Sequence, residues 1–251
     1  MPEYRENRMK KKLSEGKCAT VFGGLNTAEM IDYMGQFGFD GAWIDTEHSP
    51  NTWEQIAHMT RACDLWGMTS LCRVNSNEPW LITRMLDVGA TGIVVPHVNT
   101  KEQAEKAAKS AKYGPLGYRG MAAGRQSYGV TDYYRKANEQ TLLVVYIEEV
   151  EAVENLDEIL TVDNIDVFLP GPIDLAQSMG YTGQPEHPEV VKVVDECVEK
   201  ILAAGRVAGT LGSEATIERS IGQGARFLLS GWQQWVAKGA NQYLSMVNSK
   251  A

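Results

Sequence analysis

The chain has 251 residues, a length that suits one α/β barrel domain. Hydrophobic residues make up 43% of the chain and charged residues 22%, which is typical of a globular protein with a sizeable core. The formal charge of −8 argues against nucleic acid or an anionic membrane surface as a partner. An anionic small substrate would therefore need a local cation rather than the overall charge of the protein.

The N-terminal segment is charged and lacks the apolar stretch of a secretory signal, and no apolar run approaches the roughly 18 residues of a membrane span. The four cysteines show no paired CxxC spacing, so we interpret them as reduced thiols of a cytoplasmic protein. The basic run Lys10, Lys11 and Lys12 is interpreted as a solvated helix face rather than as a binding arm.

Short apolar runs alternate with longer amphipathic segments, which is the pattern of βα units around a parallel sheet. The predicted strands are residues 18–24, 39–45, 69–74, 92–98, 141–148, 165–171, 206–212 and 226–231. The predicted helices are residues 27–35, 51–66, 78–88, 100–113, a segment from 150 onward, 188–205, 213 to 222 or 224, and 232–250. Thr100 is expected to cap the fourth helix and Ser213 the seventh.

Eight strands alternating with eight helices predict a single (β/α)8 barrel over residues 1–251, in preference to an open doubly wound sheet. The segment GQGARF at 222–227 lacks the third glycine of a dinucleotide fingerprint and follows a helix rather than a strand. The long loop 114–130 is expected to be functional, and the segment from 172 to 184 is expected to be irregular.

The active site of such a barrel lies at the carboxyl ends of its strands. The residues at or just beyond those ends are Asp45, Glu47, His48, Arg73, Pro96, His97, Glu148, Glu149, Gly171, Pro172, Asp174, Gly212, Ser230 and Gly231. Carboxylates, imidazoles and a guanidinium are therefore expected to converge on one rim.

Side chains alternate across the fifth strand, so Leu143, Val145 and Ile147 share one face. This aliphatic face is expected to pack under the helices, which turns Glu148 toward the barrel mouth. Glu149 is expected to begin the next helix, where the helix dipole favours an acidic residue.

Glu148 and Asp174 are carboxylates from neighbouring strand ends with no cysteine nearby. Such hard oxygen donors suit Mg²⁺ or Mn²⁺, with the other positions left to water and substrate. The alternative is that Asp174 caps a helix or belongs to a turn.

Arg73 lies within an apolar strand and must find an anion there, because an unpaired buried charge is costly. It either forms an ion pair with Asp45 or Asp87, or it binds a substrate carboxylate or a developing enolate oxygen. His48 is either structural or a general base oriented by Asp45, with Asp87 as a second orienting candidate. His97 is a weaker candidate for the same role.

The sequence resembles the HpcH/HpaI class II pyruvate aldolases. The resemblance rests on GFDGAWIDTEHSPN, RVNSNEPWLITRMLDVGATGIVVPHVNTKEQA, KYGPLGYRG, IEEVEAVENL and FLPGPIDLAQSMG, in family order from Gly38 to Gly180. It implies reversible cleavage of 4-hydroxy-2-oxoacids, such as 2-keto-3-deoxy sugar acids, to pyruvate and an aldehyde through a pyruvate enolate. The implied cofactor is a divalent metal, Mg²⁺ or Mn²⁺ with Co²⁺ also possible.

The resemblance also implies residue roles. His48 would be the base, acting through water with support from Asp45 and Asp87, and Arg73 would hold pyruvate and its enolate. Glu148 and Asp174 would bind the metal. The substrate would also meet Gly171, Pro172, Gly212 and Arg119, the last of these from the KYGPLGYRG loop on the aldehyde side. The family forms hexamers, as trimers of dimers, in which the last helix, here 232–249, packs on a neighbouring subunit.

Three residues depart from the family pattern. Tyr146 stands where many members have glutamine, and Ile173 replaces a small residue. The last strand runs into Trp232 without the acidic residue that several relatives have there. These changes bear on the substrate mouth more than on the metal ligands.

Two other functions remain open. One is an acyl-CoA lyase of the same superfamily, acting on citramalyl- or malyl-CoA, which would need a basic groove for the CoA phosphates. The other is a non-catalytic barrel that binds a small acid. A lysine imine is not expected, because the predicted strands carry no lysine and Lys101, at a polar helix start, is the remaining candidate near the rim.

Overall fold

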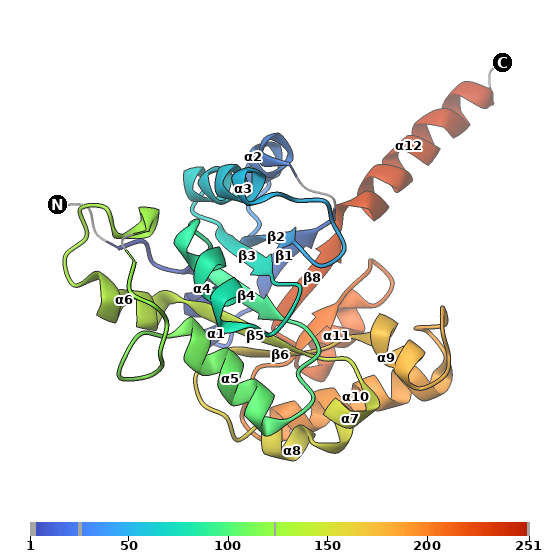
Figure 1. Ribbon diagram of the computed structural model, residues 1–251. Coiled ribbons are helices and arrows are strands. Elements are labelled where there is room, and N and C mark those ends of the chain that lie inside the picture. Colours follow the sequence, from blue (N-terminus) through green and yellow to red (C-terminus); the bar gives the residue numbers. More distant parts are fainter. Residues whose placement is uncertain (1–3, 25–26, 123, 250–251) are drawn as a thin grey trace.

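The computed structural model describes residues 4–24, 27–122 and 124–249 (Figure 1). Its centre is one sheet of eight parallel strands. The strands are β1 (Ala19–Gly23), β2 (Gly41–Asp45), β3 (Thr69–Arg73), β4 (Gly92–Val95), β5 (Leu142–Ile147), β6 (Val167–Pro170), β7 (Gly209–Leu211) and β8 (Phe227–Gly231). All eight predicted strands are confirmed, with ends that shift by up to three residues.

Helices surround the sheet (Figure 1). They are α1 (Arg8–Ser14), α2 (Ala28–Gly35), α3 (Trp53–Leu65), α4 (Pro79–Asp87), α5 (Lys101–Ala111), α6 (Tyr133–Gln140), α7 (Val150–Glu154), α8 (Leu156–Ile159), α9 (Pro172–Ser178), α10 (Pro188–Ala203), α11 (Ile217–Gln223) and α12 (Trp232–Asn248). A short 3-10 turn, Arg125–Ser127, lies in the long loop before α6.

The sheet closes on itself. β8 pairs with β1 along its whole length, and β1 to β6 pair in sequence order. β6 and β7 meet through one parallel bridge, Phe168 to Ala208, so the barrel has a seam there. The structure therefore confirms the (β/α)8 barrel and excludes the open doubly wound sheet.

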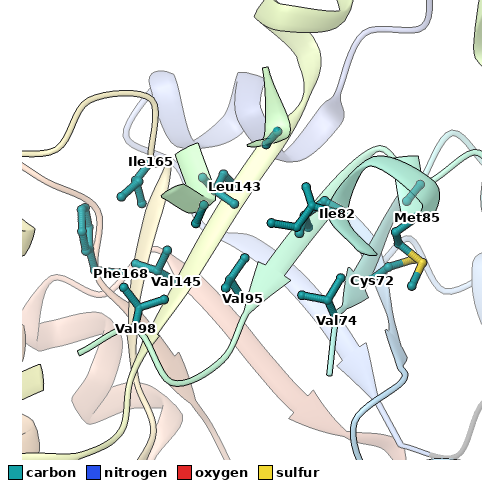
Figure 2. Close-up of a cluster of buried hydrophobic side chains, with 14 of the residues drawn as sticks. Cys72, Val74, Ile82, Met85, Val95, Val98, Leu143, Val145, Ile165 and Phe168 are labelled. Atoms are coloured by element: carbon teal, nitrogen blue, oxygen red, sulfur yellow. The ribbon is translucent and has the colours of Figure 1, made fainter. Parts of the chain in front are cut away.

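The strands separate two apolar layers, because successive side chains point to opposite faces. Val144 and Tyr146 of β5 belong to the barrel interior, together with Trp43, Leu71 and Leu229. The alternate residues of β5 belong to the layer under the helices. Figure 2 shows part of that outer layer, in which α4 packs against strands β3 and β4. The predicted orientation of β5 is confirmed.

Helix α1 closes the amino-terminal end of the barrel. Its Met9 is fully buried in the interior layer. Lys10 Nζ lies 2.7 Å from the Asp166 carboxylate, and Lys12 Nζ lies 2.8 Å from that of Asp40. The interpretation of this basic run as a solvated face was therefore wrong for Lys10 and Lys12, since both neutralise acids at strand beginnings.

Asn7, the N-cap of α1, bonds to three distant segments. Its side-chain Nδ2 donates to the carbonyl oxygens of Thr91 and Gln140, both at 3.0 Å. Its Oδ1 accepts a hydrogen bond from the hydroxyl of Thr69 at 2.8 Å. Helix α1 is thus fixed to the first residue of β3 and to residues that precede β4 and β5.

Helices α6 and α9 were not predicted from the sequence, because their formation depends on contacts with distant parts of the chain. The polar helix α6 is held by Asn138, whose side chain donates to and accepts from the backbone of Tyr113. Helix α9 occupies the start of the segment expected to be irregular. The expected cap at Ser213 was wrong, because α11 begins at Ile217 after a turn in which the Ser213 amide bonds Thr216 Oγ1.

The last helix, α12, extends away from the barrel (Figure 1). Trp235, in the first turn of α12, stacks on Phe39 with ring centroids 5.4 Å apart. No residue of α12 is buried in the described chain. Five large apolar side chains of α12 are about half exposed: Val236, Tyr243, Leu244, Met246 and Val247. Within the described ranges, no helix combines the length and the hydropathy that a membrane span requires.

Candidate active site

A cavity of about 600 Å³ opens at the carboxyl ends of the strands. Seven residues predicted for the site line it: His48, Arg73, Glu148, Gly171, Pro172, Asp174 and Gly212. They come from five different strand ends, so the closed barrel brings together residues that are up to 164 positions apart in the chain.

Arg73 is both ion-paired and part of the cavity wall. Its Nε and Nη2 donate to the two carboxylate oxygens of Asp45 at 2.8 and 2.7 Å, and Nη1 lies 2.7 Å from Glu47 Oε2. Burial disfavours the charge of Arg73, but hydrogen bonding and attraction by Asp45 outweigh it and raise the pKa of Arg73. Arg73 is therefore a permanent cation with a fixed orientation, and the two predicted roles do not exclude each other.

Glu47 was expected on the rim but was given no catalytic, binding or metal role, although it is central to this arrangement. Its carboxylate binds Arg73 and lies 3.3 Å from Nε2 of His97. Glu47 lies on a bend after the last residue of β2, so no strand period indicates where its side chain points.

Glu148 is a buried carboxyl group, 2% exposed, at the base of the cavity. Burial raises its pKa to about 7, against the effect of the His97 amide, which donates to Oε1 at 2.9 Å. The negative charge of Asp174 contributes to the same increase. Gly171 permits this close packing, since a Cβ there would lie 2.9 Å from the Cβ of Glu148.

Asp174 lies in the first turn of α9, after Gly171 at the N-cap position and Pro172. It is half-buried and faces the cavity, so it is not the helix cap that the alternative interpretation required. Glu149, expected to be structural, precedes α7 without capping it and accepts hydrogen bonds from Asn99 and from the ring of His97.

His48 lies on the loop between β2 and α3, with 67% of its side chain exposed. Its backbone amide donates to the Asp45 carboxylate, while its Nε2 is 3.9 Å from Glu47. Asp45 therefore orients the loop and Arg73 rather than the imidazole ring. Burial opposes ionisation of Asp45. Hydrogen bonds from Arg73 and from the backbone amides of Glu47 and His48 nevertheless lower its pKa.

Asp87 and Arg119 do not reach this cavity within one chain. Helix α4 runs back toward the amino-terminal end of the barrel, so Asp87 at its last turn lies there. Arg119 Nη2 bonds Asp87 at 2.7 Å, and its guanidinium stacks on Tyr113 at 4.5 Å. The expected support of His48 by Asp87, and contact of Arg119 with the substrate, are therefore not met by the single chain.

The three residues that depart from the expected sequence pattern lie in different surroundings. Tyr146 is buried in the barrel interior below the cavity, with its ring 6.0 Å from the guanidinium of Arg73. Ile173 lines the rim and is 60% exposed. Trp232 begins α12 and packs against the outer layer.

Chelator-treated protein is expected to lose stability as the pH rises through about 7. The folded-state pKa of Glu148 lies above the ordinary value of 4.5, so the folded protein binds more protons than the unfolded chain between these values. His97 acts in the same direction, since its raised pKa contributes stability that disappears at higher pH. The change is on the order of 1–3 kcal/mol, or several degrees of melting temperature.

Thermal unfolding between pH 5 and 8 measures this effect. Glu148→Gln should flatten the pH dependence, because it removes the group whose ionisation is penalised. A melting temperature that rises over this interval in the chelator-treated wild type would contradict the assignment.

Comparisons with known proteins agree with this geometry. Residues 19–234 match the family model HpcH/HpaI aldolase/citrate lyase. The hydroxypyruvate/pyruvate aldolase of Roseobacter denitrificans is 40% identical over 88% of this chain and 89% of its own length. The 2-keto-3-deoxy-L-rhamnonate aldolase of Salmonella gallinarum is 35% identical over 90% and 86%.

Among solved structures, an HpcH/HpaI aldolase/citrate lyase family protein from Burkholderia cenocepacia superposes with a TM-score of 0.90 at 27% identity, covering 96% of this chain and 99% of that protein. The resemblance inferred from the sequence motifs is therefore confirmed over the full barrel. The chain belongs to the HpcH/HpaI aldolase/citrate lyase family.

Proposed function

We propose that this protein is a metal-dependent aldolase that cleaves 4-hydroxy-2-oxoacids to pyruvate and an aldehyde, and catalyses the reverse addition. The observation that carries the proposal is the meeting of Glu148, Asp174 and Arg73 in one cavity. Two aldolases are similar in sequence to this protein over most of its chain, and this similarity supports the same class of reaction.

The residues present fit a divalent cation. Glu148 and Asp174 supply oxygen donors, and burial raises the pKa of Glu148, so a bound cation would stabilise its ionised form. Among the described residues, no group of three or more acidic, histidine or cysteine side chains is placed to hold a metal alone. A cation held by this pair would leave coordination positions for water and substrate, as Mg²⁺ and Mn²⁺ commonly do. Co²⁺ is a further candidate.

When bound, the cation supplies Lewis-acid polarisation of the substrate ketone. His48 accepts the proton of the C4 hydroxyl through a water molecule, the C3–C4 bond breaks, and the aldehyde leaves. The electron pair remains on the pyruvate enolate, whose oxygen Arg73 stabilises with a fixed positive charge. Gly171, Pro172 and Gly212 shape the wall against which the oxoacid lies. A proton returned to C3 completes the reaction.

The main competing route is an imine on lysine. Within the part of the chain that the structure describes, no lysine lines the cavity, and Lys101 begins α5 outside it. A CoA thioester would need basic residues at the mouth. Arg219, on that rim, is already paired with Asp195, which does not favour an acyl-CoA substrate.

Removal of divalent metal is expected to abolish aldol turnover. A screen of 4-hydroxy-2-oxoacids coupled to pyruvate detection should show activity that EDTA removes and that Mg²⁺, Mn²⁺ or Co²⁺ restores. Borohydride added with pyruvate should leave the protein active and its mass unchanged. A pyruvyl-lysine adduct with indifference to EDTA would overturn the metal mechanism, and inactivity on every oxoacid would favour the non-catalytic barrel.

We also propose that the protein assembles as a homo-hexamer and is located in the cytoplasm. The large apolar side chains of α12 beyond Trp235 (Val236, Tyr243, Leu244, Met246 and Val247) are about half exposed in the single chain, which supports packing on a neighbouring subunit in a homo-hexamer, a trimer of dimers. Such packing could also bring Asp87 and Arg119 of one subunit near another, which sedimentation and crosslinking would test. Four free cysteines fit a reducing cytoplasm.

A further inference from the structure

His97 has an unusual backbone conformation at the end of β4. Its φ is 53°, in the left-handed region that costs an L-residue on the order of 1 kcal/mol. Among described residues other than glycine, Asp132 and Asn164 share this property. This turn directs the backbone N–H of His97 to Oε1 of Glu148, at 2.9 Å.

The imidazole of His97 lies among three carboxylates. Nδ1 lies 2.7 Å from Glu149 Oε1 and 3.7 Å from Glu148 Oε1, while Nε2 lies 3.3 Å from Glu47 Oε1. Glu47 in turn binds Arg73. His97, after β4, therefore connects Glu148, which follows β5, with the Glu47 carboxylate that binds Arg73 of β3.

The ring does not itself line the cavity, so it does not contact substrate there. A glutamate has three rotatable side-chain bonds, and its buried carboxylate needs a partner to fix its direction. The amide of His97 occupies Oε1 of Glu148, which leaves Oε2 for a cation in the cavity. Groups that orient metal ligands in this way commonly contribute 10–100-fold to metal affinity.

We infer that His97 is a positioning residue that fixes the Glu148 carboxylate for metal binding. The left-handed backbone aims its amide, and the ring, held by Glu149 and Glu47, keeps the backbone in that conformation. The inference rests on the proposed role of Glu148 as a metal ligand. It assigns a function to a residue that the reaction itself does not use.

Three variants separate positioning from simple stability. His97→Gly tolerates positive φ but removes the ring that holds the backbone in that conformation, so the protein should fold while Mn²⁺ binding weakens about tenfold. His97→Val cannot adopt positive φ without strain, so Mn²⁺ should bind up to about 100-fold more weakly. His97→Asn tolerates the conformation and carries a donor, so it should stay within a few-fold of wild type.

Asn164→Val is the matched control, because Asn164 has φ 64° and lies exposed before β6 at the far end of the barrel. It should lower the melting temperature and leave the Mn²⁺ dissociation constant unchanged. Electron paramagnetic resonance of free Mn²⁺ measures binding without reference to turnover.

The outcomes distinguish the two proposals. If wild type binds Mn²⁺ in a manner that Glu148→Gln abolishes, but His97→Gly retains the wild-type dissociation constant, the His97 inference alone is overturned. The glycine variant decides this even if His97→Val does not fold. If wild type fails to bind Mn²⁺ at all, the metal role of Glu148 fails and the His97 inference fails with it.

Discussion

Glu148→Gln is expected to abolish metal-dependent turnover while the barrel remains folded. The amide keeps the shape of the side chain but loses the negative charge and one oxygen donor, so the cavity retains Asp174 as its acidic ligand. Because burial already penalises the Glu148 charge, the metal-free variant should be at least as stable as the metal-free wild type. Isothermal titration with Mn²⁺ and thermal unfolding measure the two effects separately.

Asp174→Asn should produce the same loss of metal binding, because it removes the charge of the second proposed ligand and leaves Glu148 unchanged. Glu151→Gln provides a matched control, since Glu151 is exposed in the first turn of α7, three residues after Glu148. The control should retain wild-type turnover. Wild-type metal affinity and turnover in both Glu148→Gln and Asp174→Asn would show that the ligand assignment is wrong.

Arg73→Ala is expected to lower turnover by about 10²–10³-fold, as removal of a preorganised transition-state charge contact does in other enzymes. Stability should fall as well, because Asp45 and Glu47 lose their common partner. Arg73→Lys should recover part of the stability and little of the rate. A lysine ammonium cannot reproduce the bidentate contact that orients the Arg73 guanidinium.

The comparison of kcat with thermal stability decides between the two roles of Arg73. Arg84→Ala is a suitable control, since Arg84 stacks on Trp53 at 4.2 Å on the outside of the barrel. It should affect stability slightly and kcat not at all. If Arg73→Ala lowers the melting temperature but its folded fraction turns over at the wild-type rate, Arg73 serves only as an ion-pair partner.

Much of the fold follows from local pattern, because a parallel barrel repeats one unit eight times. The two-residue period of β5 was enough to separate Glu148 from Ile147 and to point it at the mouth. Helix α9 was missed because Gly171 and Pro172 also suit a loop, and the start of that helix depends on contacts with β5. Helix α6 was missed because its polar sequence gains order from Tyr113 rather than from its own periodicity.

The residues of the site were harder to predict than their strands. Glu47 and His97 follow strands on irregular backbone, where no period indicates direction, and the left-handed φ of His97 has no sequence signal of its own. Asp87 and Arg119 show what the single chain leaves open. Motif position suggested that they belong to the site, but a single chain places both at the amino-terminal end of the barrel, bonded to each other.

The attachment of α1 also constrains the order in which the protein can be completed during synthesis. Asn7 bonds the carbonyl oxygen of Gln140, and Lys10 pairs with Asp166, so α1 cannot complete its contacts until the residues before β5 and β6 have been synthesised. Until then, the apolar side chain of Met9 has no interior to enter. A nascent chain that ends before β6 therefore leaves this apolar side chain outside a finished core, a form suited to capture by chaperones.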